Sequence, residues 1–148
     1  MLFNQAGYAL NSMLTGALSE VGISVKVYCV LKKAIDGDYT QSQLSELAWM
    51  DKSTIVNVLD EMERDGLAVR RFSPTDRRVR LVSVTAKGRA RLARAEVVVE
   101  ATYEKVLGAL PASQRSVFVA ALARLVEGPL ASPFHMEEQL RRPARRPR

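Results

Sequence analysis

The chain has 148 residues, 47% of them hydrophobic and 26% charged, which suits one soluble domain with a buried core. A single cysteine and a single histidine exclude a disulfide framework and a usual zinc site, and they make a histidine-dependent nucleophilic triad implausible. The net charge of +6 is weak evidence for an anionic partner, because five of the positive charges are arginines among the last eight residues.

The first 35 residues predict two helices. Apolar residues recur at helical spacing from Leu2 to Glu20, and Gly22 interrupts the pattern. Ser24 can cap a second helix, which Gly37 and the residue after it end. No apolar run approaches the ~20 residues of a membrane span, and the N-terminus lacks a signal-peptide pattern. We therefore expect a cytoplasmic protein.

A helix-turn-helix is predicted next. Thr40 and Gln43 match a capping box that starts a short third helix. Asp51 can cap the fourth helix after a turn of only three residues. Gly66 stands where the end of a helix favours left-handed backbone. The fourth helix has one apolar face, made by Ile55, Val58, Leu59 and Met62.

A hairpin and two further helices complete the predicted fold. Strands at Ala68–Phe72 and Val79–Val84 flank a turn, and Thr85 caps a long helix that runs to about Ala109. Pro111 starts a sixth helix. We expect the buried positions of the long helix to be Val97, Val98, Tyr103, Val106, Leu107 and Leu110. One face of the sixth helix carries the apolar residues Phe118, Ala121, Leu122 and Leu125. Residues 1–127 then form one domain, and 128–148 a flexible basic tail.

The solvent face of the fourth helix carries residue types that read base edges and bind phosphate in a DNA major groove. The free N–H groups at the start of this helix can also bind a phosphate. Acidic residues follow from Asp60 onward, so we expect contact with DNA to be confined to the first half of the helix. An ordinary amphipathic helix with a solvated polar face explains this helix equally well when it is considered alone. The candidate residues are Lys52, Ser53, Thr54, Val56 and Asn57.

The hairpin favours the DNA-binding interpretation. Its tip carries Arg77 and Arg78, which suit the strongly negative potential of a minor groove. The alternative is a charged strand edge that prevents aggregation. A helix-turn-helix followed directly by a basic hairpin is much more specific than either part. No constellation in the sequence supports an enzyme, a cofactor or a metal.

Residues 40–88 resemble the winged helix-turn-helix of the MarR family of bacterial transcription regulators. The resemblance lies in QSQLSELAWMDKSTIVNVLDEMERDGLAVRR, TDRR and LVSVTAKG, with Asp76-Arg77-Arg78 and Val84-Thr85 matching the family's wing signature. It implies a mainly α fold with a small β-hairpin, in which residues 1–35 and 89–127 are scaffold and dimerisation helices. The implied DNA-contacting set also includes Gln41 and Ser42.

The same resemblance implies a homodimer on a pseudo-palindromic duplex, usually a repressor, with a pocket for a small aromatic or amphipathic ligand. Residues that could line this pocket are Tyr8, Met13, Tyr28 and Trp49, for which core packing is the safer interpretation. Trp49 could be a core residue, a pocket wall or a dimer contact. Cys29 is expected to be a small buried hydrophobe rather than a thiol sensor.

Two positions depart from the family pattern. Asn57 and Glu61 stand where relatives often carry a basic residue, so we expect fewer phosphate contacts and a different operator. We predict a sequence-specific transcription regulator. The alternative is a winged-helix architectural or protein-interaction module that does not read sequence.

Overall fold

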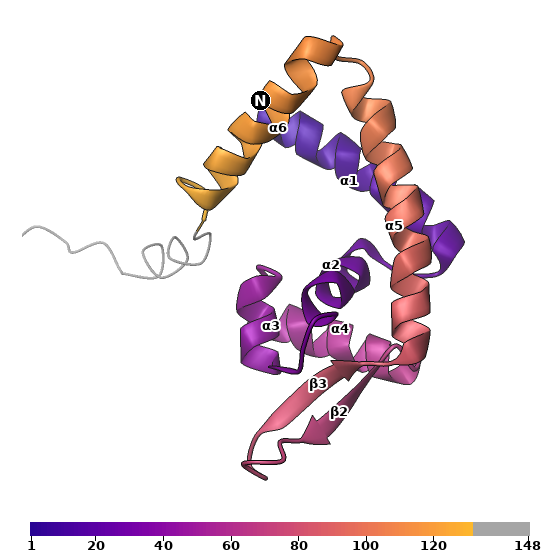
Figure 1. Cartoon of the computed structure of the whole chain (residues 1–148), viewed down its shortest axis with the longest axis vertical. Helices are drawn as coiled ribbons and strands as arrows, with labels where there is room; N and C mark the ends of the chain where they lie inside the picture. The colour runs from indigo at the N-terminus through magenta and orange to yellow at the C-terminus, as the bar shows by residue number, and fades with distance from the viewer. Residues whose placement is uncertain (132–148) are drawn as a thin grey trace, which may run out of the picture. The chain divides into compact units, whose positions relative to one another are not determined.

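The computed structural model describes residues 1–131, and the predicted tail beyond this point lies outside the described residues. The chain separates into two units, residues 1–105 and the residues from 106 onward. The elements are α1 (Leu2–Val21), α2 (Val25–Ala34), β1 (Tyr39–Thr40), α3 (Gln41–Leu47), α4 (Lys52–Arg64), β2 (Ala68–Phe72), β3 (Arg80–Val84), α5 (Ala86–Leu107) and α6 (Ala112–Glu127). Figure 1 labels all of them except β1.

The predicted helix boundaries are confirmed by their capping contacts. The Ser24 side chain accepts a hydrogen bond from the Val27 amide at the start of α2. Thr40 and Gln43 form the reciprocal capping box of α3. Gly22 and Gly66 both have left-handed backbone, with φ of 76° and 69°, and they end α1 and the turn after α4.

The core of the first unit lies where α1, α2, α3 and α4 meet the sheet. The predicted apolar face of α4 is buried there, and Leu67 folds back over the helix end with its amide bonded to the Met62 carbonyl at 2.7 Å. Full burial of such side chains contributes about 1.5–3 kcal/mol each. The largest fully buried side chains are Leu18, Val27, Val30, Leu31, Leu44, Ile55, Leu59, Met62 and Leu67.

The sheet has three antiparallel strands in the order β1-β3-β2. The hairpin was predicted, but β1 was not, because a two-residue strand leaves no periodic pattern. Paired residues of neighbouring strands share a face of the sheet, so the pairs Arg70 with Val82 and Phe72 with Arg80 lie on one face. Arg71 lies on the opposite face.

The start of α5 is fastened to the turn between α4 and β2. The Thr85 hydroxyl donates to the Gly66 carbonyl at 2.7 Å and accepts from the Gly88 amide at 3.0 Å. A Cβ atom at Gly88 would lie 2.1 Å from the Leu67 carbonyl oxygen. Only glycine therefore allows this close approach between α5 and the turn before β2.

The predicted buried face of α5 is only partly right for the single chain, since Val98 packs against the core but other predicted positions are exposed. The buried positions of α5 are Gly88, Leu92, Ala95, Val99 and Thr102, whereas Val97, Tyr103 and Val106 are exposed. An amphipathic pattern does not say which of two apolar faces meets the chain's own core. In α6 no residue is buried, and the residues of its predicted apolar face (Phe118, Ala121, Leu122 and Leu125) are exposed.

Candidate nucleic-acid interface

The first turn of α4 is organised by the Asp51 carboxylate. It accepts from the amides of Ser53 and Thr54 at 2.9 and 2.8 Å, and from their hydroxyls at 2.5 and 2.6 Å. The hydroxyl hydrogen bonds, followed by those of the amides, hold the pKa of this carboxyl far below its usual value. The predicted free amides for a phosphate are therefore occupied at Ser53 and Thr54.

This arrangement changes what Ser53 and Thr54 can offer to DNA. Their hydroxyl hydrogens point to Asp51, so the remaining lone pairs can accept hydrogen bonds but the hydrogens are already committed. Lone pairs suit the exocyclic amino groups of cytosine and adenine in a major groove. Both residues are thus better placed to accept from base edges than to donate to phosphates.

The other predicted contacts of the helix-turn-helix lie at accessible positions. Lys52 and Asn57 are exposed on α4, and Val56 is partly exposed between them. Gln41 and Ser42 form the first turn of α3, where Ser42 is exposed. These residues all belong to one unit with the buried face of α4, so the core fixes their relative positions.

The acidic second half of α4 is partly neutralised from the wing. The Arg70 guanidinium on β2 lies 2.6 Å from an Asp60 oxygen and 2.7 Å from a Glu63 oxygen. Its side chain is only 19% exposed. This role of Arg70 could not be predicted from the sequence, because the pairing depends on which face of the sheet packs against α4.

The wing tip presents two arginines from a turn that is ordered by its own hydrogen bonds. The Ser73 amide donates to the Val79 carbonyl at 2.8 Å, and the Arg78 amide donates to Asp76 at 2.9 Å. Arg77 and Arg78 are exposed. Within residues 1–131, no carboxylate lies within ion-pair distance of either guanidinium. Both charges are available to a phosphate backbone or a minor groove.

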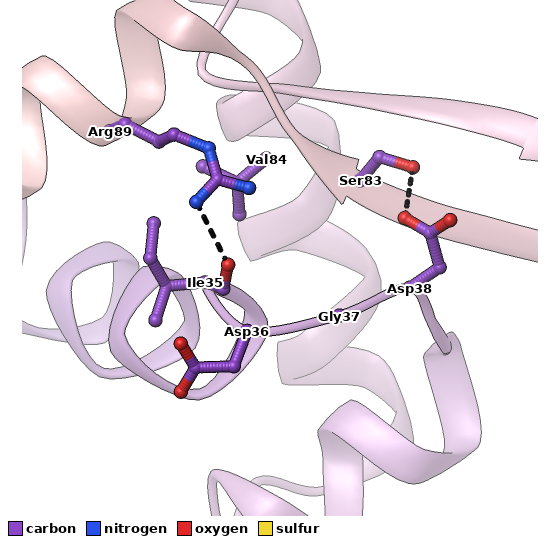
Figure 2. A pocket seen from close by; sticks show the side chains of 7 residues that line it. All are labelled: Ile35, Asp36, Gly37, Asp38, Ser83, Val84 and Arg89. Atoms are coloured by element: carbon purple, nitrogen blue, oxygen red, sulfur yellow. Dashed lines mark hydrogen bonds between the residues drawn. The ribbon is translucent and has the colours of Figure 1, made fainter.

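Two cavities lie on the first unit. One, of about 420 Å³, is lined by polar groups of the α2–β1 loop, the end of β3 and the start of α5 (Figure 2). In it Arg89 donates to the Ile35 carbonyl at 3.0 Å and Ser83 donates to Asp38 at 2.5 Å. The other, of about 260 Å³, is lined by Gln41, Asp60, Arg70, Arg80 and Val82.

The predicted ligand-binding residues line neither of these cavities. Tyr8 is 81% exposed on α1, Met13 is partly exposed, and Tyr28 packs against the core. Trp49 is not a core residue, because it is 45% exposed and takes a left-handed backbone with φ of 53° in the turn between α3 and α4. Their role in ligand binding stays a prediction.

Cys29 packs against the hydrophobic core from α2 and is partly buried. Burial raises the pKa of this thiol, so the reactive thiolate is disfavoured. The environment agrees with the predicted small hydrophobe rather than an activated sensor.

Within residues 1–131, no cluster of three or more metal-ligating side chains occurs. In the same part of the chain, no single helix is long and apolar enough to cross a membrane, and two bent helix pairs reach the required length and composition only together.

The comparisons with known proteins agree on one family. A model of the MarR family matches residues 34–79. A curated protein of Thauera aromatica, "Putative transcriptional regulatory protein for hcr operon", is 31% identical over 118 residues, which cover 79% of this chain and 71% of that protein.

Solved structures extend the similarity over most of the fold. CouR from Rhodococcus jostii RHA1, bound to p-coumaroyl-CoA, is 27% identical with a TM-score of 0.71, covering 86% of this chain and 90% of CouR. The MarR family protein Rv2887 of Mycobacterium tuberculosis, in complex with DNA, is 27% identical with a TM-score of 0.69, covering 84% and 93%. With the helix-turn-helix and wing described above, these matches show that the chain belongs to the MarR family of transcriptional regulators.

Proposed function

We propose that this chain is a homodimeric repressor that binds a pseudo-palindromic DNA duplex and releases it when a small molecule binds. One observation carries the proposal: the same unit exposes the polar first half of α4 and two arginines at the wing tip. Within residues 1–131, neither arginine has a carboxylate partner. The DNA complex of the similar Rv2887 supports it.

In this proposal α4 enters a major groove with its first turns, and the wing lies in the neighbouring minor groove. Lys52 contacts a phosphate, and Asn57 reads a base edge with its amide. Arg77 and Arg78 then supply a large share of the affinity, because α4 itself carries few cations. The protein acts on DNA in the cytoplasm and needs no catalytic activity.

The homodimer is supported by apolar side chains that the single chain leaves exposed. Phe3 on α1 and Phe118 and Leu122 on α6 are exposed, and apolar side chains that gather on a surface mark sites of protein–protein interaction. A two-fold dimer buries the same surface of both subunits and places the two copies of α4 about one turn of DNA apart.

A small acidic aromatic compound or its thioester is the proposed class of effector. CouR, which is similar over most of its length, was solved with p-coumaroyl-CoA. A ligand that binds one spacing of the two α4 helices better than another shifts the population away from the DNA-binding state.

The test is selection of bound duplexes from a random library, followed by affinity measurements on the selected sequence. We expect a two-fold symmetric consensus, and weaker binding by Arg77→Ala and Arg78→Ala. The matched control is Arg94→Ala, which removes an exposed arginine of α5, outside the helix-turn-helix and the wing. The proposal is contradicted if the selected duplexes share no consensus. It is also contradicted if Arg77→Ala and Arg78→Ala bind the selected duplex as tightly as Arg94→Ala.

The acidic half of α4 favours a second candidate, a winged-helix module that binds protein or DNA without reading sequence. Arg70 weakens this argument, because it pairs with two of the acidic side chains. Binding with a steep salt dependence and no consensus supports the architectural form, and no binding at low salt supports the protein-interaction form.

A further inference from the structure

We infer that the cavity lined by Gln41, Asp60, Arg70, Arg80 and Val82, here called the crossing groove, seats a phosphate of the DNA strand that passes between α4 and the wing. Arg80 is the phosphate contact, and Arg70 is a positioning residue that cancels the acidic charge beside it. The inference rests on the proposed function and adds residues outside the wing tip and the first turns of α4.

The location of the groove follows from the topology. Its lining comes from the start of α3, the middle of α4, β2 and β3, so it lies at the junction of helix-turn-helix and wing. Neighbouring major and minor grooves of a duplex are separated by one sugar–phosphate strand. A protein with α4 in one groove and the wing in the next must let that strand pass over their junction.

Arg80 is oriented for such a contact. The register pairs it with Phe72, and its guanidinium lies 5.1 Å from the centre of the Phe72 ring. This stacking restrains the long side chain and leaves the planar N–H edge available to a phosphate. Within residues 1–131, no carboxylate lies within ion-pair distance of Arg80.

Arg70 removes an obstacle to the same contact. Asp60 lines the groove and Glu63 lies one turn further along α4, so both carboxylates would repel a passing phosphate. The Arg70 guanidinium binds both, and its amide also donates to Glu63 at 3.3 Å. The two carboxylates and the two guanidiniums together carry no net charge. Without Arg70, the two carboxylates and Arg80 carry a net charge of −1.

The first experiment compares Arg80→Ala with Arg71→Ala in the full chain, measuring affinity for operator and random duplex over a range of salt concentrations. Arg71 is the matched control, because it is an exposed arginine one residue from Phe72 on the opposite face of the sheet. For Arg80→Ala we expect about tenfold weaker binding to both duplexes and a salt slope smaller by about 0.9. For Arg71→Ala we expect no change in slope.

A neutral methylphosphonate, placed one at a time along the operator, locates the contact. At one phosphate per half-site the substitution should weaken the wild type and leave Arg80→Ala unaffected. If Arg80→Ala keeps the wild-type affinity and slope while the wild type still prefers its operator, the inference is wrong and the proposed function stands. If the wild type shows no preference for its operator over random duplex, the proposed function itself is wrong.

The second experiment tests Arg70 by charge compensation. Arg70→Met should weaken operator binding, and adding Asp60→Asn and Glu63→Gln to it should restore most of the affinity, because the repelling charges are then gone. Circular dichroism and the melting temperature check that each variant is folded. If the triple variant binds as weakly as a folded Arg70→Met, charge cancellation is not the role of Arg70.

Discussion

At the residue scale, Asn57 is the side chain on which base recognition is proposed to depend most. It is exposed on α4 one turn beyond the residues that Asp51 holds, and its amide can both donate and accept. Asn57→Ala should reduce the preference at one base pair of each half-site by about 1–3 kcal/mol and leave the salt slope unchanged. Affinities for duplexes substituted at single positions measure this. A uniform loss over all positions would contradict a base contact.

Asp51 makes a pH-dependent contribution to stability. Hydrogen bonds from the Ser53 and Thr54 hydroxyls lower its pKa below the ordinary 3.8, so the folded state favours the charged carboxylate. The contribution is therefore fully present above this ordinary pKa and is lost as the pH falls below it. Asp51→Ala should be less stable than the wild type by a constant amount from about pH 5 to 8, with a difference that narrows below about pH 4. Thermal unfolding at each pH measures it, and a constant difference down to pH 2 would contradict this.

At the element scale, the caps and the buried face of α4 were predictable because they depend on neighbours within one turn. The capping contacts of Thr40 with Gln43, and of Asp51 with the residues that follow it, can be read from the spacing of these residues in the sequence. The pairing of Arg70 with α4 was not predictable, because it depends on which face of β2 turns toward the helix. The buried face of α5 was predicted only in part for a similar reason, since Val98 packs against the core but Val97 is exposed.

Gly88 is the glycine of the first unit at which a side chain would meet the closest backbone contact, where α5 approaches the turn before β2. Alanine favours a helix over glycine by about 1 kcal/mol, but its Cβ would meet the Leu67 carbonyl at 2.1 Å. A clash with backbone cannot be relieved by a rotamer change, so Gly88→Ala should destabilise the fold by about 3 kcal/mol or more. Gly16→Ala in α1 is the control, because its Cβ meets nothing within 4 Å. In denaturant unfolding, Gly88→Ala should be less stable than the wild type and Gly16→Ala more stable. Equal stability of the two variants would contradict the close approach.

At the scale of the whole molecule, the location of the positive charge bears on DNA binding, and the exposed apolar surface bears on dimerisation. Five of the six net charges belong to the last eight residues, so the described part of the chain must bind DNA through local placement of cations. The sequence located the wing arginines correctly at an exposed tip, and α6 leaves its apolar face exposed in one chain.

Dimerisation can be tested on that face of α6. Leu122→Glu should convert the dimer to a monomer and weaken operator binding, because a charge in an apolar interface loses its hydration. Ser113→Glu is the matched control, since nine residues at 100° each place it on the opposite side of the helix. Sedimentation velocity measures the oligomeric state. A Leu122→Glu variant that stays dimeric would show that this face is not the interface.

The central claim is that the chain reads DNA sequence. Its most direct test is the ratio of affinities of the full chain for its selected operator and for a scrambled duplex of equal length at about 150 mM salt. A sequence-reading dimer should prefer the operator by about 10³-fold or more. Equal affinities for the two duplexes, with the dimer and its fold intact, would contradict the account.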